Sequence, residues 1–211
     1  MESSDLFGDR LFNALERNDP AAGTLLVAAP GMMAPEFARS VIFIIEHDAN
    51  GTLGVDLTAR SETPVHNVME SWAPLMHKPP VVYIGGPVNQ TQPLCIGVLK
   101  NGVKDVPETV APDNGLPMME KLAHRFALLN LGADPNGFSD YIESARIFVG
   151  YAGWEPGQLH DEIQRGDWFV APALPSDVLA PAGADVWGDV MRRQSWPLPM
   201  YATFPMDVRD N

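Results

Sequence analysis

Residues that could do chemistry stand at the two ends of one apolar run. Arg39 and Ser40 precede residues 41–45, and Glu46 and His47 follow them. A serine nucleophile needs a base within hydrogen-bonding distance, whereas an extended strand rises ~3.3 Å per residue. Ser40 and His47 are therefore too far apart to form one dyad. Because Ser40 also lacks the Gly-x-Ser-x-Gly flanks of a nucleophile elbow, we expect it to make structural hydrogen bonds.

Glu46 and His47 remain as acid–base candidates. Histidine is the side chain whose ordinary pKa lies closest to neutral pH, so His47 is the leading general base by residue type. The other histidines show no paired spacing such as His-Glu-x-x-His, and a single cysteine cannot build a thiolate cluster, so neither a metal site nor a cofactor is predicted. The alternative is that Glu46 and His47 hold the turn at Asn50-Gly51 through backbone hydrogen bonds.

Two glycine-containing segments could approach a ligand closely. Gly85-Gly86-Pro87 lacks the Lys-Ser/Thr of a Walker A loop and the third glycine of a dinucleotide fingerprint, so we expect a tight bend. Downstream, Trp154 precedes a predicted helix whose first N–H groups, near Gly157, could bind a small acidic ligand. In the structural alternative, Gln158 and Glu162 share one helix face and satisfy backbone groups, while Trp154 packs under the helix.

The elements that must position these residues follow from apolar periodicity. Short β-branched runs bounded by Gly or Pro predict strands at residues 25–29, 41–45, 53–57, 81–84, 94–99, 145–151 and 168–171. Apolar residues at helical spacing predict helices at 63–77 (continuous or broken), 116–129, 156–165 and 185–194, with one turn at 176–179. Because strands and helices interleave without a strict βαβ period, we predict a mixed α/β fold that borders on α+β and is not a Rossmann fold.

The length of the chain bounds its domain organisation. With 211 residues, 45% of them hydrophobic, the chain can bury one substantial core, so residues 1–211 are predicted to form a single domain. Residues 1–20 are expected to form a helical extension that covers the sheet. Residues 185–211 are expected to form a final helix and a tail.

Charge and cysteine content exclude several classes of protein. Fourteen Lys and Arg residues against 27 Asp and Glu residues leave a net charge of -13, and this acidic average repels phosphate backbones. Direct binding to nucleic acid is therefore not expected. Cys95, the one cysteine, is predicted to be a small buried hydrophobe and cannot form an internal disulfide. No segment approaches ~20 uninterrupted apolar residues, so we expect a soluble, cytoplasmic protein without a membrane span.

Several motifs, in this order and at these spacings, resemble the AlgH/YqgE-like family of uncharacterised bacterial proteins. The shared segments cover most of the chain: Leu25 to Pro30, Phe37 to Ile42 with Glu46-His47, Gly51 to Gly54, Tyr83 to Val88, and Gly150 to Leu159 with Glu162 and Trp168. The ending from Phe204 to Asp207 looks like the actinobacterial branch of this family.

The resemblance implies a fold and a label but no substrate. Members carry the name of candidate transcriptional regulators, and their fold implies an irregular, partly bifurcated mixed sheet surrounded by helices. The chain departs from the family pattern at Ala34, where an Asp is usual, and at Asp56, Thr58, Ala59 and Arg60, where an Asn-Arg-Pro-like end is usual. Any shared polar site that used the Asp and the Asn is altered here.

Three functions are consistent with these observations. The first is a non-enzymatic binding or regulatory protein that contacts a protein partner or a small effector. The second is a hydrolase of small metabolites, with His47 or Glu46 as base and backbone N–H groups near the glycines as anion stabilisers. The third, a direct DNA-binding regulator, is disfavoured by the acidic charge. The candidate polar site comprises Arg39, Ser40, Glu46, His47, Gly85, Gly86, Trp154, Gln158 and Glu162.

Overall fold

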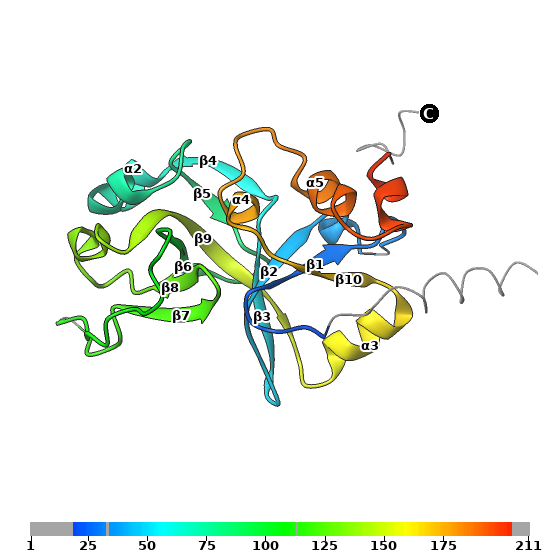
Figure 1. Cartoon of the computed structure of the whole chain (residues 1–211), viewed down its shortest axis with the longest axis horizontal. Coiled ribbons are helices and arrows are strands. Elements are labelled where there is room, and N and C mark those ends of the chain that lie inside the picture. Colours follow the sequence, from blue (N-terminus) through cyan, green and yellow to red (C-terminus); the bar gives the residue numbers. More distant parts are fainter. Residues whose placement is uncertain (1–18, 33, 113, 204–211) are drawn as a thin grey trace, which may run out of the picture.

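A branched ten-stranded sheet organises the protein (Figure 1). The computed structural model describes residues 19–32, 34–112 and 114–203. The strands are β1 (Thr24–Ala28), β2 (Val41–Asp48), β3 (Gly51–Asp56), β4 (Arg60–Pro64), β5 (Val81–Ile84), β6 (Val88–Leu99), β7 (Met119–Ala123), β8 (Phe126–Leu129), β9 (Ile142–Trp154) and β10 (Trp168–Pro172). Their main order is β10-β1-β2-β3-β9-β6-β8-β7, and β4 and β5 form a side branch.

The helices of the described chain are short. The α-helices are α2 (Val65–Val68), α3 (Gln158–Arg165), α4 (Pro175–Val178) and α5 (Val186–Arg192), and the 3-10 helices are η1 (Pro35–Phe37), η2 (Glu70–Leu75), η3 (Pro135–Phe138) and η4 (Leu198–Thr203). None of these helices is long and apolar enough to cross a bilayer.

The long strand β9 joins the two parts of the sheet (Figure 1). One of its edges pairs antiparallel with β6. Its other edge pairs parallel with β5 at Phe148 and Val149, and then antiparallel with β3 at residues 152–154. The sheet therefore branches at β9 and is mixed, as predicted, although every other pairing of named strands is antiparallel.

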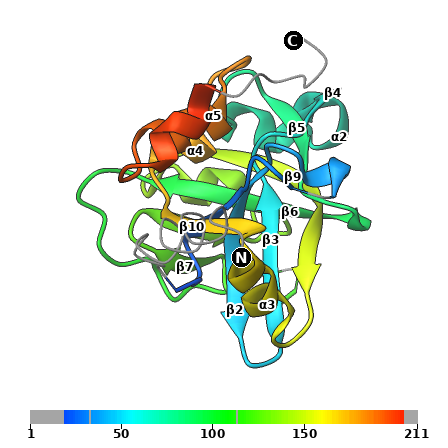
Figure 2. The ribbon, with the colours of Figure 1, turned by 90° about the vertical axis from the view of Figure 1, so that its right-hand side faces the viewer.

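The sheet curls until strands distant in its order touch. The rings of Phe43 in β2 and Phe126 in β8 meet edge to face with centroids 4.9 Å apart, and both belong to one buried cluster. On the opposite face of β2, Ile42 belongs to a second cluster, together with Leu26 of β1 and Leu159 of α3. The sheet thus covers much of itself, and the expectation of a sheet surrounded by helices is corrected to a curled sheet with a few helices (Figure 2).

The predicted helix at residues 116–129 is wrong, because this segment forms the β7–β8 hairpin. His124 adopts a positive φ of 46° at the turn, and Phe126 to Leu129 pair with Cys95 to Val98 of β6. The apolar residues of this segment fit helical spacing. The two strands have only five and four residues, and over such short runs apolar periodicity does not distinguish a helix from a strand. Pairing with β6 in the tertiary fold decides between them.

The remaining predicted elements lie where expected, with one addition. The predicted helix at 63–77 is broken into α2 and η2, and its start at Thr63 and Pro64 belongs instead to β4, a strand that was not predicted. The helices predicted at 156–165 and 185–194 are α3 and α5, and α4 is the predicted turn at 176–179. The expected N-terminal helix lies almost entirely outside the described residues.

Candidate functional site

Ser40 occupies a buried structural position at the start of β2. Its hydroxyl donates to Oδ2 of Asp56 at 2.5 Å, and Oδ1 of Asp56 accepts from the backbone N–H and the hydroxyl of Thr58. Burial raises the pKa of the Asp56 carboxyl, while these hydrogen bonds act in the opposite direction. The structural role expected for Ser40 is confirmed. In the described part of the chain the hydroxyl of Ser40 is bonded to a carboxylate and not to a histidine.

His47 lies at the far end of β2, beside the hairpin turn. Its Nδ1 is 2.6 Å from Oγ1 of Thr52 on β3, while the turn is held by Asp48, whose Oδ1 accepts from the N–H of Asn50 at 2.6 Å. Among the described residues it is therefore the Asp48 side chain that bonds the turn backbone, while His47 bonds the Thr52 side chain across the hairpin. Asp48 does so because a short carboxylate can bond the backbone two residues ahead.

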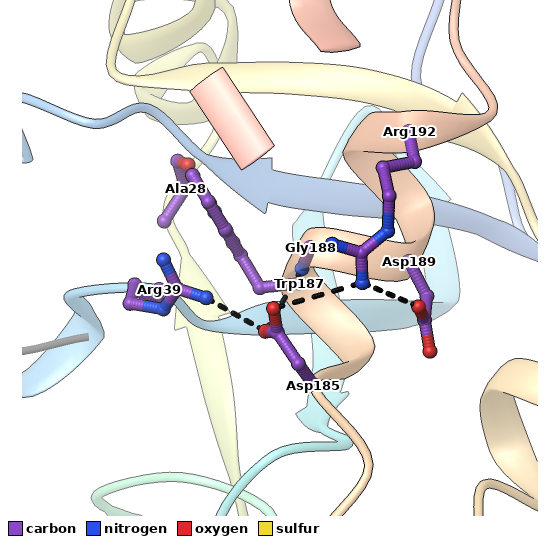
Figure 3. A network of polar contacts seen from close by, with 7 residues as sticks. All are labelled: Ala28, Arg39, Asp185, Trp187, Gly188, Asp189 and Arg192. Atoms are coloured by element: carbon purple, nitrogen blue, oxygen red, sulfur yellow. Dashed lines mark hydrogen bonds and ion pairs between the residues drawn. The ribbon is translucent and has the colours of Figure 1, made fainter. Parts of the chain in front are cut away.

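Arg39 belongs to a network with α5 (Figure 3). Its guanidinium donates to Oδ1 of Asp185 at 2.7 Å and lies 4.1 Å from the ring centroid of Trp187. The indole N–H of Trp187 donates to the carbonyl of Ala28 in β1, at 2.7 Å. Arg192 also reaches Asp185. This network attaches α5 to the sheet, so Arg39 does not share a site with Glu46 or His47.

Gly85 and Gly86 let the chain after β5 pass directly against β9. A Cβ at Gly85 would stand 2.3 Å from the carbonyl oxygen of Gly150, and one at Gly86, which has a φ of 155°, would stand 2.2 Å from the carbonyl carbon of Tyr151. The N–H of Gly85 donates to the carbonyl of Val149. The expected close approach is confirmed, and this N–H is not free to hold an anion.

A polar cluster centres on Glu162 in α3. Its Oε2 accepts from the indole N–H groups of Trp154 at 2.7 Å and Trp168 at 2.9 Å, and its Oε1 accepts from the Gln158 amide at 2.9 Å. The Gln158 carbonyl oxygen in turn accepts from the backbone N–H of Glu155. Gln158 therefore satisfies the backbone N–H that follows the end of β9, as the structural alternative predicted. Glu162 instead accepts hydrogen bonds from the two indole N–H groups.

The two indoles border a cavity of about 320 Å³, here called the indole cavity. Their ring centroids are 5.9 Å apart and nearly perpendicular. The cavity is mostly apolar and is lined by Met32, Ala34, Phe37, Pro87, Val88, Ala152, Gly153, Trp154, Gln158, Glu162, Arg165, Asp167 and Trp168. Arg165 and Asp167 pair with each other at 2.8 Å, so their two opposite charges offset one another in the lining.

A second cavity of about 500 Å³, here called the acidic cavity, adjoins the first. It lies along the β2–β3 hairpin and carries three carboxylates, those of Glu46, Asp48 and Glu155. Val88, Gly153 and Trp154 line both cavities, and we call the two together the composite groove. In the described part of the chain, no three metal-ligating side chains are placed to hold a metal ion.

The family model with the description AlgH-like matches residues 25–199, which contain the whole composite groove. The chain belongs to the AlgH-like family. An uncharacterised UPF0301 protein of Corynebacterium efficiens is 53% identical over 208 residues, which cover 99% of this chain and all of the relative. One from Mycobacterium ulcerans is 48% identical over 190 residues and 90% of each chain. Both are actinobacteria, which confirms the expected branch.

Two solved structures resemble this AlgH-like chain. The crystal structure of protein DIP2367 from Corynebacterium diphtheriae is 53% identical, has a TM-score of 0.84, and covers 94% of this chain and 100% of that chain. The solution structure of the AlgH protein from Pseudomonas aeruginosa is 22% identical, with a TM-score of 0.60 and coverage of 92% and 100%. The second likeness shows the fold alone.

The AlgH-like chain brings four of the nine candidate residues to the groove. Glu46 lines the acidic cavity, Gln158 and Glu162 line the indole cavity, and Trp154 lines both. The other five, Arg39, Ser40, His47, Gly85 and Gly86, are absent from the lining of both cavities. Sequence reasoning missed Met32, Phe37 and Asp48 as lining residues and did not connect Trp168 to Glu162. The sequence feature that could have indicated this contact is the position of Glu162 between Trp154 and Trp168 along the chain.

The departures from the AlgH-like pattern fall in two separate places. Ala34 lines the indole cavity, where a longer side chain would reduce its volume. Asp56 and Thr58 instead form the buried network with Ser40. These positions therefore do not form one altered polar site in this chain.

Proposed function

We propose that this chain is a cytoplasmic, non-enzymatic binding protein whose composite groove receives a protein or small-molecule partner. The observation that carries the proposal is the bonding of Glu162. A general base needs a lone pair aimed at substrate, but the carboxylate of Glu162 accepts three hydrogen bonds from its own cavity wall, two on Oε2 and one on Oε1, so most of its acceptor capacity is used structurally. A cavity with mostly apolar walls and a few fixed polar groups is typical of ligand binding.

The hydrolase alternative has less support from the geometry. His47 is bonded to Thr52 and lines neither cavity, and the N–H of Gly85 is bonded to Val149. At the start of α3, the N–H of Gln158 donates to the carbonyl of Glu155. Catalysis by these groups would require each of them to exchange an existing partner for substrate.

Direct contact with DNA also has little support. The net charge of -13 repels phosphates, and the composite groove adds three carboxylates at one end. A regulatory role, such as the family label suggests, would therefore act through protein or small-molecule partners.

Tryptophan resonances offer a direct test of binding. The chain has five tryptophans, so a ¹⁵N-labelled sample gives a small set of indole N–H signals, which single Trp→Phe variants assign. Unlabelled indole serves as a neutral aromatic probe. Binding in the indole cavity should shift the signals of Trp154 and Trp168, while those of buried Trp72 and Trp187 stay in place.

A matched pair of variants locates the probe. Ala34→Phe adds a ring inside the indole cavity and should abolish the shifts, whereas Ala49→Phe adds the same ring at an exposed turn and should preserve them. The absence of shifts in the unsubstituted chain, or shifts only at exposed Trp196, would contradict the proposal. Hydrolysis of p-nitrophenyl acetate that His47→Gln abolishes would favour the hydrolase instead.

A further inference from the structure

We infer that the occupant of the composite groove is an extended peptide segment that adds to the open edge of β9, with an aromatic side chain next to a basic one. The inference rests on the proposed function, because it names the partner of the same groove. Three independent features of the groove lead to it: an unpaired strand edge, the alternation of the two cavities along that edge, and the charge of one of them.

The C-terminal end of β9 has an unpaired edge. Residues 152–154 pair with β3 on one side, while β6 flanks β9 on the other side and its pairing ends at Val88 with Tyr151. No named strand of the described chain pairs with this second edge at residues 152–154. Gly153 is exposed there. A strand edge with free backbone donors and acceptors is a template for an added peptide strand.

The two cavities open on opposite faces of the sheet at this edge, as the alternating side chains of an added peptide strand require. Successive side chains of a strand point to opposite faces. Ala152 and Trp154 belong to the cluster beside the indole cavity, whereas Tyr151 packs against the cluster on the other face and lines the acidic cavity. Gly153 and Trp154 line both cavities. Neighbouring side chains of an added strand would therefore enter different cavities.

The polarity and charge of each cavity indicate which peptide side chain it would bind. The indole cavity, about 320 Å³ and faced by Phe37, Trp154 and Trp168, suits an aromatic ring. In the acidic cavity, neither Glu46 nor Glu155 forms an ion pair within the described part of the chain. A Lys or Arg side chain would supply the missing positive charge, and the net charge of -13 favours the approach of a basic partner.

Defined peptides test each feature separately. The probe is the neutral-ended peptide acetyl-Thr-Lys-Phe-Lys-Thr-amide, titrated into the ¹⁵N-labelled full chain with the indole N–H signals as readout. The first comparison replaces both Lys residues of the probe by Glu. The second methylates the backbone nitrogens next to Phe, which removes the strand donors. The third uses phenethylamine, an aromatic amine without a peptide backbone.

The expected result is a clear order of affinity. The basic peptide should shift the Trp154 and Trp168 signals, and the Glu peptide and the methylated peptide should each bind about tenfold or more weakly. The double variant with Glu46→Gln and Glu155→Gln should lower the affinity for the basic peptide by a similar factor and leave the affinity for indole unchanged. Glu62→Gln, at an exposed position on β4, is the matched control and should change neither.

Other outcomes overturn the inference in distinguishable ways. If phenethylamine or the methylated peptide binds as well as the basic peptide, strand addition is wrong, although the groove still binds ligands. If the Glu peptide binds equally well, the assignment of a basic side chain is wrong. If indole shifts the two signals but no peptide does, the peptide partner is wrong and the proposed function stands. If neither binds, both fail.

Discussion

Glu162 shows how one residue can organise a site without reacting in it. Its carboxylate accepts from two indole N–H groups and one amide, so it fixes the orientation of Trp154 and Trp168 around the indole cavity. Hydrogen bonds to a charged acceptor are stronger than neutral ones, and indole donors left unpaired in an apolar site are costly. At the residue scale, the wall of the groove therefore depends on this carboxylate.

Replacing Glu162 should destabilise the fold measurably. Glu162→Ala leaves the indole N–H groups of Trp154 and Trp168 without their acceptor, so we expect the free energy of unfolding to fall by about 1–3 kcal/mol in urea titrations. Asp161→Ala, at an exposed position on the same helix, is the control and should change it by less than about 0.5 kcal/mol. Equal effects of the two substitutions would show that the indole bonds contribute little.

Asp56 should give the fold a characteristic pH dependence. Because burial raises its pKa in the folded chain, the folded state keeps the proton to higher pH than the unfolded chain does. Stability from this group is thus present below the ordinary carboxyl pKa of about 4 and is lost as pH rises through the raised value. Asp56→Asn, which does not titrate, should gain stability relative to the unsubstituted chain as pH rises through that window.

The measurement is urea unfolding of both chains at several pH values from about 4 upward. All other titrating groups are shared, so the difference between the two chains isolates Asp56. A difference for Asp56→Asn that is constant or shrinks with rising pH would contradict the raised pKa.

At the element scale, the β2–β3 hairpin and α3 are held against the end of β9. Gly51 has a φ of 141°, and a Cβ there would stand 2.4 Å from the carbonyl oxygen of Trp154. Trp154, only 7% exposed, packs in the cluster that joins β1, β2 and α3. The walls of the groove are therefore set by close contacts between these elements.

Gly51→Val should loosen the hairpin. Valine is disfavoured at this φ and its Cβ would collide with the backbone of β9, so we expect a loss of about 1–3 kcal/mol of unfolding free energy. Gly31→Val is a suitable control, since no atom lies within 4 Å of its added Cβ and its φ is not positive. Unfolding at the same urea concentration in both variants would argue against the close approach.

Trp154→Ala should remove the packing between β9 and α3. Truncating a buried tryptophan costs about 3–5 kcal/mol in protein cores, and this residue also donates to Glu162. Trp196, which is 73% exposed, provides the comparison, because Trp196→Ala should leave the melting temperature nearly unchanged. An unchanged melting temperature for Trp154→Ala would place the indole outside the core.

At the scale of the whole molecule, the curled sheet encloses its one cysteine. Cys95 lies in β6 between β8 and β9, is fully buried, and burial raises the pKa of its thiol well above the ordinary value. The thiolate is the reactive form, so neither access nor ionisation favours reaction in the folded chain. The expectation that Cys95 is a small buried hydrophobe is confirmed.

Alkylation of Cys95 should therefore report opening of the sheet. We expect iodoacetamide to leave the folded chain unmodified and to label it in urea with the same midpoint as unfolding followed by fluorescence. Mass spectrometry of the intact chain measures the labelled fraction. Rapid labelling without urea would mean that the sheet opens locally near β6, or that it is not closed around Cys95.

Local patterns predicted the strands of this protein better than its helices. The β-branched runs at 41–45 and 81–84 are strands in the structure, as expected for short β-branched and aromatic runs that fit a pleated, at least half-buried surface. The helix predicted at residues 116–129 is wrong because β8 pairs with β6, whose partner residues lie 28 to 34 positions earlier in the sequence. The strand β4 was missed because Arg60–Pro64 has little apolar character, with most of its side chains exposed at an edge.

The sequence by itself determined the family, the mixed sheet, the buried cysteine and the separation of Ser40 from His47, because each follows from local spacing or from motifs in order. Only the tertiary structure decided the site. It placed Glu162 between two tryptophans from different strands, bonded Arg39 to Asp185 at the start of α5, and brought Glu46 and Trp154 to the lining of one cavity. These contacts arise where the curled sheet and α3 meet, and no local pattern encodes which distant side chains that meeting brings together.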